Sequence, residues 1–134
     1  MSDRQISLEI VTPEKIVYSA DVTSIYAPAT LGGIGILPGH TALITGLTIG
    51  QLRITPAGGN EEQLFVSGGF LEINHDKAVI LAKSAEKRED IDVERAKEAK
   101  ARAEERLNSR TEGLDVDRAE AALKRAITRL KIAE

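Results

Sequence analysis

Apolar and polar residues alternate in short runs over the first two thirds of the chain. Ile6, Leu8 and Ile10 are separated by single polar residues, which is the period of a strand with one buried face. Seven further runs rich in apolar and β-branched residues follow, with breaks such as Pro28 and Gly68 between them. They lie at residues 15–18, 21–27, 42–45, 47–54, 63–67, 70–73 and 78–82. Because no helical period separates them, the pattern predicts an antiparallel β-sandwich or flattened barrel over residues 1–85.

A helical period begins near residue 86. Apolar residues, many of them alanine, recur at helical spacing from 96 to 107 and again from 119 to 130. Asp92 is the expected N-cap of the first helix; Asp115 or Asp117 begins the second, and Asp117 and Glu120 are spaced for a capping box. The short link around residues 108–113 predicts an antiparallel two-helix hairpin over residues 86–134. The expected fold class is therefore α+β, with strands and helices in separate segments.

The apolar stripes of both predicted helices consist mainly of alanine. An alanine methyl group removes little surface from water, whereas a buried leucine contributes about 1.5–3 kcal/mol. Two helices of this length are also marginally stable on their own. We therefore expect the hairpin to depend on a second surface, either the β-domain or a partner, and to be able to detach from it.

Composition and charge support this division and narrow the function. All four prolines, all four aromatic residues and ten of the eleven glycines precede residue 85, whereas 26 of the last 49 residues are charged. The net charge of −3 argues against a general affinity for nucleic acid or anionic membranes. The N-terminus has no signal pattern, and no apolar run reaches the ~18–20 residues of a membrane span. We therefore expect a cytoplasmic protein that meets a membrane only through a partner.

The sequence lacks the motifs of the common enzyme classes. It has no G-x-x-x-x-G-K-[ST] phosphate loop and no cysteine, and its two histidines, His40 and His75, are far apart. We therefore expect no catalytic residue and no bound metal. A jelly-roll metal enzyme is the weakest alternative, because the clustered histidine and glutamate ligands of such sites do not appear.

Two glycine-containing segments, residues 32–40 and 65–72, are the most distinctive part of the predicted β-domain. In the first, glycine and proline restrict a loop that carries Ile34, Ile36 and Leu37. Two interpretations of this loop are open. Either it presents its apolar side chains to a partner, or it is a turn whose isoleucines lie in the core.

These two segments and the charged, alanine-rich hairpin together resemble the ε subunit of bacterial F-type ATP synthases, over the whole chain. The resemblance implies a β-domain that lies between the γ stalk subunit and the membrane c-ring, at the cytoplasmic face of the plasma membrane. It implies a contact surface formed by Ile34, Ile36, Leu37, Pro38 and His40. The family often has an acidic residue at the position of Gly33, so this chain lacks a carboxylate that would make a polar contact with the c-ring.

The resemblance also implies an inhibitory role for the hairpin. In an extended form the hairpin would reach the catalytic α and β subunits and block rotation in the direction of ATP hydrolysis. Basic side chains would meet acidic surface there. They include Arg106, Arg118, Lys124, Arg125, Arg129 and Lys131.

The segment Ile91-Asp92-Val93-Glu94-Arg95-Ala96 resembles the nucleotide motif of those ε subunits that bind ATP in the hairpin. The resemblance implies that one set of residues holds the adenine and ribose: Glu86, Asp92, Arg95 and Ala96. A second set would face the phosphates: Arg102, Arg125 and Arg129. ATP would be a regulatory ligand rather than a substrate or catalytic cofactor, and the sequence does not require Mg²⁺ with it.

The spacing of the arginines agrees with an anion site, but a simpler interpretation is open. Arg95 and Arg102 are seven residues apart and Arg125 and Arg129 four, so each pair shares one helix face. However, residues 114–119 repeat the pattern of residues 91–96, and apolar-Asp-x-x-Arg-Ala is typical of a helix start. The alternative function is a free-standing nucleotide-sensing adaptor without a rotary partner.

Overall fold

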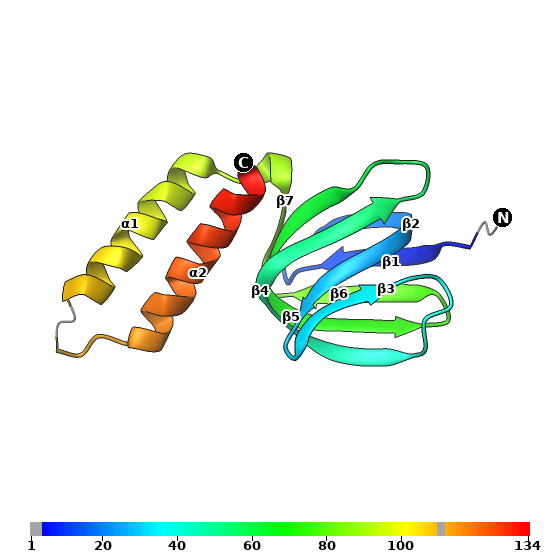
Figure 1. The fold of residues 1–134 in the computed structure, drawn as a ribbon, viewed down its shortest axis with the longest axis horizontal. Coiled ribbons are helices and arrows are strands. Elements are labelled where there is room, and N and C mark those ends of the chain that lie inside the picture. Colours follow the sequence, from blue (N-terminus) through cyan, green and yellow to red (C-terminus); the bar gives the residue numbers. More distant parts are fainter. Residues whose placement is uncertain (1–3, 110–111) are drawn as a thin grey trace.

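The chain forms two bodies, a closed β-structure and a helical hairpin against one of its sides (Figure 1). The computed structural model describes residues 4–109 and 112–134. The predicted class, strands first and a two-helix hairpin after them, is confirmed. The strands are β1 (Ile6–Val11), β2 (Ile16–Ala29), β3 (Gly32–Ile36), β4 (Leu43–Pro56), β5 (Glu62–Asn74), β6 (Lys77–Ala82) and β7 (Ala85–Lys87). The short 3-10 turn η1 (Arg88–Asp90) leads to α1 (Val93–Ser109) and α2 (Val116–Ala133).

The sheet closes on itself as a flattened barrel. Its strands follow the order β1-β6-β5-β4-β2-β3, and an additional pairing of β1 with β2 closes β1, β6, β5, β4 and β2 into a circuit, with β3 paired to β2 outside it. All pairings are antiparallel except that of β1 with β6, where Ser7 pairs with Lys77 and Val11 with Leu81. The barrel is therefore antiparallel with one parallel seam, which the alternating pattern did not reveal.

Three strands are longer than the sequence pattern predicts. The runs at 15–18 and 21–27 join in β2, those at 42–45 and 47–54 in β4, and those at 63–67 and 70–73 in β5. Pro28 is not a break but lies within β2, and Gly32 and Gly33 belong to β3, a strand that the pattern missed. Long strands that bend can pair with different neighbours along their length, and this is how β2 contacts β1, β3 and β4.

Gly68 and Gly69 mark the bend of β5. Both have positive φ, of 96° and 132°, and a Cβ atom at Gly69 would lie 2.0 Å from the Leu81 carbonyl oxygen. Before the two glycines β5 pairs with β7, and from Gly69 onward it pairs with β6. Only glycine tolerates both the backbone conformation and this close approach. The glycine pair thus lets one strand serve two partners.

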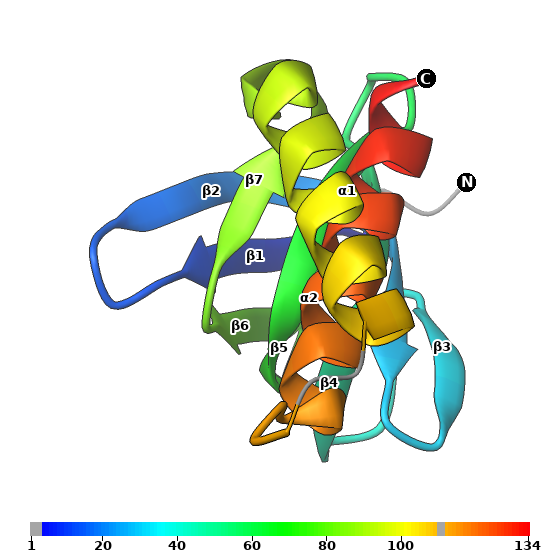
Figure 2. The same ribbon diagram turned by 90° about the vertical axis from the view of Figure 1, so that its left-hand side faces the viewer.

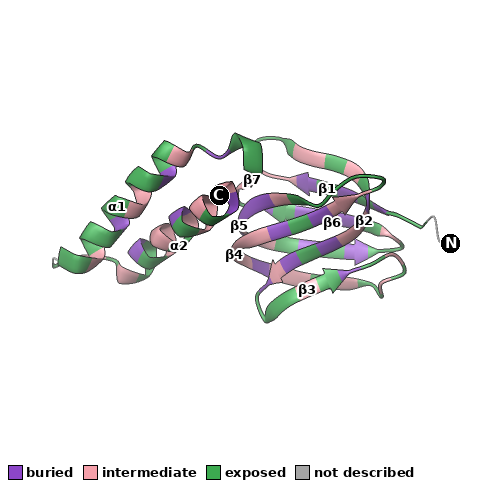
Figure 3. Cartoon of the chain, turned by 45° about the horizontal axis from the view of Figure 1, so that its top comes forward, coloured by how far each residue is buried: buried purple, intermediate pink, exposed green. Residues whose placement is uncertain are grey.

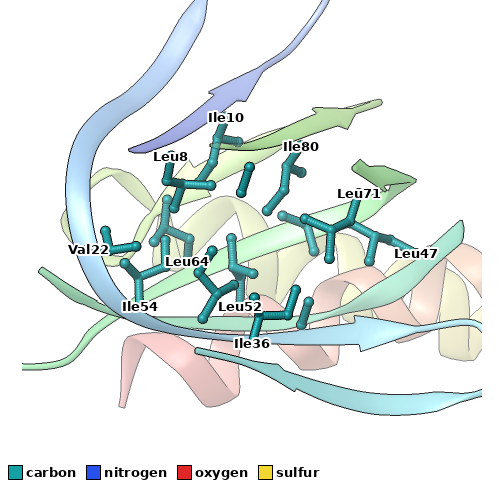
Figure 4. Close-up of a cluster of buried hydrophobic side chains, with 14 of the residues drawn as sticks. Leu8, Ile10, Val22, Ile36, Leu47, Leu52, Ile54, Leu64, Leu71 and Ile80 are labelled. Atoms are coloured by element: carbon teal, nitrogen blue, oxygen red, sulfur yellow. The ribbon is translucent and has the colours of Figure 1, made fainter. Parts of the chain in front are cut away.

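Branched aliphatic side chains fill the barrel. Ile6, Leu8 and Ile10 of β1 point inward and are completely buried, as the alternating pattern predicts. They pack with Leu52, Leu71 and further aliphatic side chains from strands β2 to β6 (Figure 4). Figure 3 shows the consequence as alternating buried and exposed positions along the strands. Burial of this much apolar surface makes the barrel the stable part of the molecule.

The predicted helix starts are present, with one correction. The Asp92 carboxylate accepts a hydrogen bond from the Arg95 backbone N–H at 3.1 Å, and Asp115 accepts one from the Arg118 N–H at 3.0 Å. Asp115 is therefore the N-cap of α2, and Asp117 lies in the first turn instead of forming a capping box with Glu120. The predicted link at 108–113 includes residues 110 and 111, which lie outside the described residues.

The two helices have unequal contact with the barrel. α2 lies against β4 and β5, whereas α1 packs on the other side of α2 (Figures 1 and 2). The residues buried between the helices are alanines: Ala96 and Ala103 of α1, and Ala119 and Ala126 of α2. A small separate cluster of Phe65, Ile91 and Ile132 joins the hairpin to the barrel.

Candidate functional site

A pocket of about 460 Å³ opens between the two helices at the end of the hairpin that is next to the barrel. All seven residues predicted as a nucleotide site line this pocket, although they come from three separate elements. They are Glu86, Asp92, Arg95, Ala96, Arg102, Arg125 and Arg129. The structure therefore brings the whole predicted set together. Its role in binding a nucleotide stays a prediction.

The local structure explains how each side chain reaches the pocket. Glu86 lies on β7, opposite Phe65 of β5, and so is fixed to the edge of the barrel. Asp92 is held at the start of α1 by its capping bond. Arg95 and Arg102 lie two turns apart on α1 and face Arg125 and Arg129 of α2 across the pocket.

Arg129 links the hairpin to the barrel. Its Nε donates to Glu86 Oε1 at 2.9 Å and its Nη2 to Glu86 Oε2 at 3.4 Å, a two-point contact between a guanidinium and a carboxylate. The guanidinium carbon also lies 4.2 Å from the centre of the buried Phe65 ring, in cation–π geometry. With their side chains 24% and 32% exposed, Arg129 and Glu86 form a pair that is only partly screened by water.

The other three arginines of the pocket have no counter-ion of this kind. Among the described residues, no carboxylate forms an ion pair with Arg95, Arg102 or Arg125. The pocket thus carries four arginines against three carboxylates, and one carboxylate is already engaged by Arg129. Cations held close to one another without anions repel, so a bound polyanion would stabilise this arrangement.

The repeated Asp-x-x-Arg pattern begins a helix in both of its copies. Asp92 and Asp115 make the same capping hydrogen bond, so the pattern is a helix start in both places. The two copies differ in their surroundings. Asp92 and Arg95 line the pocket between the helices, whereas Asp115 and Arg118 lie at the far end of the hairpin and do not line this pocket.

Sequence reasoning missed three further residues of the pocket, Asp90, Ala99 and Ala122. The two alanines belong to the predicted helical stripes, so their place between the helices follows from the period. Asp90 lies in the turn η1, and nothing in the pattern of an acidic segment tells which carboxylate faces inward.

The glycine-rich loop separates into core and surface positions. Ile36 is fully buried in the barrel, so its side chain is not available to a partner, contrary to the expected contact surface. Ile34 is half-buried and packs on the same core, while Leu37 is 63% exposed. Pro38 and His40 are half-buried at the following turn, where the His40 N–H donates to the Leu37 carbonyl. The surface that remains for a partner consists of Leu37 with the accessible parts of Ile34, Pro38 and His40.

Asp76 holds this loop in place. The Gly39 backbone N–H donates to Asp76 Oδ1 and Arg4 Nη2 donates to Oδ2, each at 2.7 Å. The bond from Gly39, and then that from Arg4, lowers the pKa of the Asp76 carboxyl below its usual range. The loop is thus pinned to the β5–β6 turn by a charged side chain.

At Gly33, where a carboxylate would be expected from the resemblance, a tyrosine occupies the space. A Cβ atom on Gly33 would lie 1.9 Å from the Tyr26 hydroxyl oxygen. The Tyr26 ring in turn lies 4.4 Å from the Arg53 guanidinium carbon, in cation–π geometry. An aromatic ring and an arginine therefore form the polar surface next to this loop.

Other kinds of site have little support in the described residues. No three metal-ligating side chains gather there into a possible metal site. None of the helices described is both long and apolar enough to cross a membrane.

Two family models together match residues 5–134. The one described as "ATP synthase, Delta/Epsilon chain, beta-sandwich domain" matches residues 5–88. The one described as "ATP synthase, Delta/Epsilon chain, long alpha-helix domain" matches residues 89–134. The first match includes β7, and with it Glu86, in the β-domain.

Individual relatives agree with the family models. An "ATP synthase epsilon chain" of Pelotomaculum thermopropionicum is 55% identical over 133 residues, which are 99% of this chain and 98% of the relative. A protein of the same name from Desulforamulus reducens is 51% identical over 127 residues, 95% of this chain and 96% of the relative. A chain in the cryo-EM structure of the Euglena gracilis mitochondrial ATP synthase is similar with a TM-score of 0.82 and 26% identity, covering 96% of this chain and 81% of that one.

Proposed function

Because this chain belongs to the delta/epsilon family of ATP synthase subunits, we propose that it is a rotor subunit that couples the γ subunit to the c-ring and inhibits ATP hydrolysis through its hairpin. The observation that carries the first part is the match of both family domains and of bacterial ε chains along the whole sequence. The exposed side of the loop at Leu37 is the part of the predicted contact surface that can reach the c-ring. The subunit then meets the membrane through the complex.

The alanine contact between the helices supports an inhibitory hairpin that changes place. Because few large side chains are buried between α1 and α2, opening the hairpin exposes little apolar surface. The cluster around Ile132 and the Arg129–Glu86 pair are the main contacts to exchange for contacts with the catalytic subunits. An element held by a few contacts is suited to a two-state switch.

We further propose that ATP binds in the pocket between the helices as a regulatory ligand. The observation that carries this proposal is the convergence of four arginines on one pocket, three of them without an ion-pair partner among the described residues. Guanidinium groups suit phosphate oxygens in charge and shape. Because the pocket exists only when the hairpin is folded, ATP stabilises the folded form by RT ln(1 + [ATP]/Kd) and opposes inhibition.

The repeated helix start provides a matched control for this proposal. Asp92→Ala and Asp115→Ala each remove one N-cap and should each destabilise a helix by about 1 kcal/mol. Only Asp92→Ala should also weaken ATP binding in a calorimetric titration of the full chain, because only Asp92 lines the pocket. Arg95→Ala and Arg118→Ala form a second matched pair, and Arg125→Ala should weaken binding as Arg95→Ala does.

Equal loss of ATP affinity in both members of a pair would mean that the motif acts through helix stability alone. Absence of any heat of binding at millimolar ATP would refute the sensor role and leave the rotor role untouched.

The rotor role and the inhibition have their own test. A chain that ends after Asp90 keeps β7 and its pairing with β5. It should assemble with γ, while the assembled enzyme hydrolyses ATP faster than the enzyme with the full chain. Failure to assemble would show that the hairpin is needed for coupling. A full chain that does not co-purify with γ would favour the free-standing adaptor.

A further inference from the structure

A second pocket, of about 520 Å³, lies between α2 and the barrel and shares two arginines with the pocket between the helices. Arg125 and Arg129 line both, so α2 separates two adjoining spaces with the same guanidinium groups at their border. We call the second space the α2–barrel groove. Its polar side chains beyond the two arginines are Thr48, Ser67, Lys83 and Ser84.

The two spaces differ in charge. The pocket between the helices contains the carboxylates of Glu86, Asp90 and Asp92 along with its arginines. Among the described residues that line the α2–barrel groove there is no carboxylate, but there are three cations and three hydroxyl groups. Carboxylates suit the hydroxyl and amino groups of a nucleoside and repel phosphate, whereas cations and hydroxyls suit phosphate oxygens.

The barrel builds the floor of this groove rigidly. The Ser67 N–H donates to the Ser84 carbonyl at 3.1 Å, and the Lys83 N–H donates to the Gly68 carbonyl at 3.2 Å. The hydroxyl oxygens of Ser67 and Ser84 are 2.6 Å apart. These bonds lie where β5 bends at its glycine pair, between its contacts with β6 and β7. The Lys83 side chain is thus exposed beside a fixed pair of hydroxyls.

Arg129 is oriented toward both spaces by contacts that leave it able to bind an anion. Its bonds to Glu86 use two of the five N–H donors of the guanidinium, and Phe65 supports one face of the plane. Arg125, one turn earlier on α2, forms no ion pair with a described residue.

We propose that the polyphosphate end of the nucleotide passes Arg125 and Arg129 into the α2–barrel groove, where Lys83 is a further phosphate ligand. This inference rests on the proposed binding of ATP. The nucleoside and the phosphate attached to it lie between the helices, and the terminal phosphates lie on the side without carboxylates. ATP then bridges α2 and the barrel as well as α1 and α2, so that it holds the entire hairpin down.

The test compares Lys83→Gln with Lys77→Gln in the full chain, by calorimetric titration with ATP, AMP and inorganic tripolyphosphate. Both lysines are exposed; Lys77 is the first residue of β6 and Lys83 directly follows its last residue, and Lys77 lines neither space. Loss of a charged hydrogen bond at an exposed position should weaken ATP and tripolyphosphate binding about fivefold to tenfold in Lys83→Gln. AMP binding, and all binding by Lys77→Gln, should change less than about twofold.

A second readout needs no substitution. The amide resonances of Ser67 and Gly68 should shift when ATP is added to the unaltered chain and should stay in place with AMP. Unchanged ATP affinity in Lys83→Gln, or an equal loss for AMP, would overturn the inference while the proposed ATP site stands. If the unaltered chain binds no ATP, both fall together.

Discussion

The barrel and the hairpin of this subunit are held together in different ways. Fully buried isoleucine and leucine side chains fill the barrel, whereas the four residues buried between the helices are all alanine. A large side chain contributes through the surface it removes from water, and an alanine through the close approach that it allows. The barrel can therefore be stable on its own, whereas the hairpin is stable only when it packs against another surface. We expect this difference to govern which variants unfold the protein and which merely release the hairpin.

The largest effect should come from the barrel. Leu71→Ala empties a completely buried position and should lower the free energy of unfolding by about 2–5 kcal/mol. Leu81→Ala, on the neighbouring strand but 56% exposed, is the control and should cost less than about 0.5 kcal/mol. Denaturant unfolding followed by circular dichroism measures both. Similar losses in the two variants would contradict the assignment of the core.

The next effect concerns hairpin release. Ile132→Ala removes the buried side chain that α2 places against Phe65 and Ile91, and should favour the open hairpin by about 2–4 kcal/mol. Amide exchange should then become faster throughout α1 and α2, while the barrel strands keep their protection. Ile127→Ala, on the same helix but 45% exposed, should leave both unchanged. Exchange as slow in the hairpin as in the barrel, even in Ile132→Ala, would contradict a detachable hairpin.

A smaller effect is expected at the polar contact between the two regions. Arg129→Gln or Glu86→Gln breaks a half-buried pair with two hydrogen bonds, which should favour release of the hairpin by about 1 kcal/mol. Because Arg129 also lines the pocket, Arg129→Gln should weaken ATP binding as well. The double variant should cost about as much stability as either single one. Additive losses would show that the two side chains act separately.

The smallest effect is a dependence on pH at the loop of the barrel. Since the folded state lowers the pKa of Asp76, its carboxylate stabilises the fold at neutral pH. This contribution is lost as the pH falls from the ordinary range of aspartate, about 4, through the lowered value. Asp76→Asn should therefore be less stable than the unaltered chain at pH 7 and equal to it once the pH is below the lowered pKa of Asp76. A deficit that persists in acid would point to lost packing instead.

Much of this arrangement could be predicted from patterns that act locally. The alternation in β1, the alanine stripes and the capping residues Asp92 and Asp115 each depend on a few neighbouring positions. The spacing of the arginines likewise predicted which of them share one face of each helix, and these faces line the pocket. What failed depends on distant contacts. Nothing near Ile36 shows that β3 would fold back on β2 and bury it.

The segment Leu64-Phe65-Val66 illustrates the same limit. All three side chains are buried, although a strand with one covered face should alternate. Leu64 and Val66 point into the barrel, and Phe65 is covered from the other side by the hairpin cluster. The sequence also did not predict that cations gather at the α2–barrel groove, because Lys83 and Arg125 are 42 positions apart in the chain.

The position of Phe65 offers a spectroscopic handle. It lies at the junction of the two bodies, under a guanidinium group and against Ile132, and the chain contains no tryptophan. An indole introduced there would be the sole strong fluorophore, excited apart from the two tyrosines. Its emission would move toward longer wavelengths when α2 departs and water arrives. Hairpin movement could then be timed in a stopped-flow mixer, inside the assembled motor if the other subunits are made free of tryptophan.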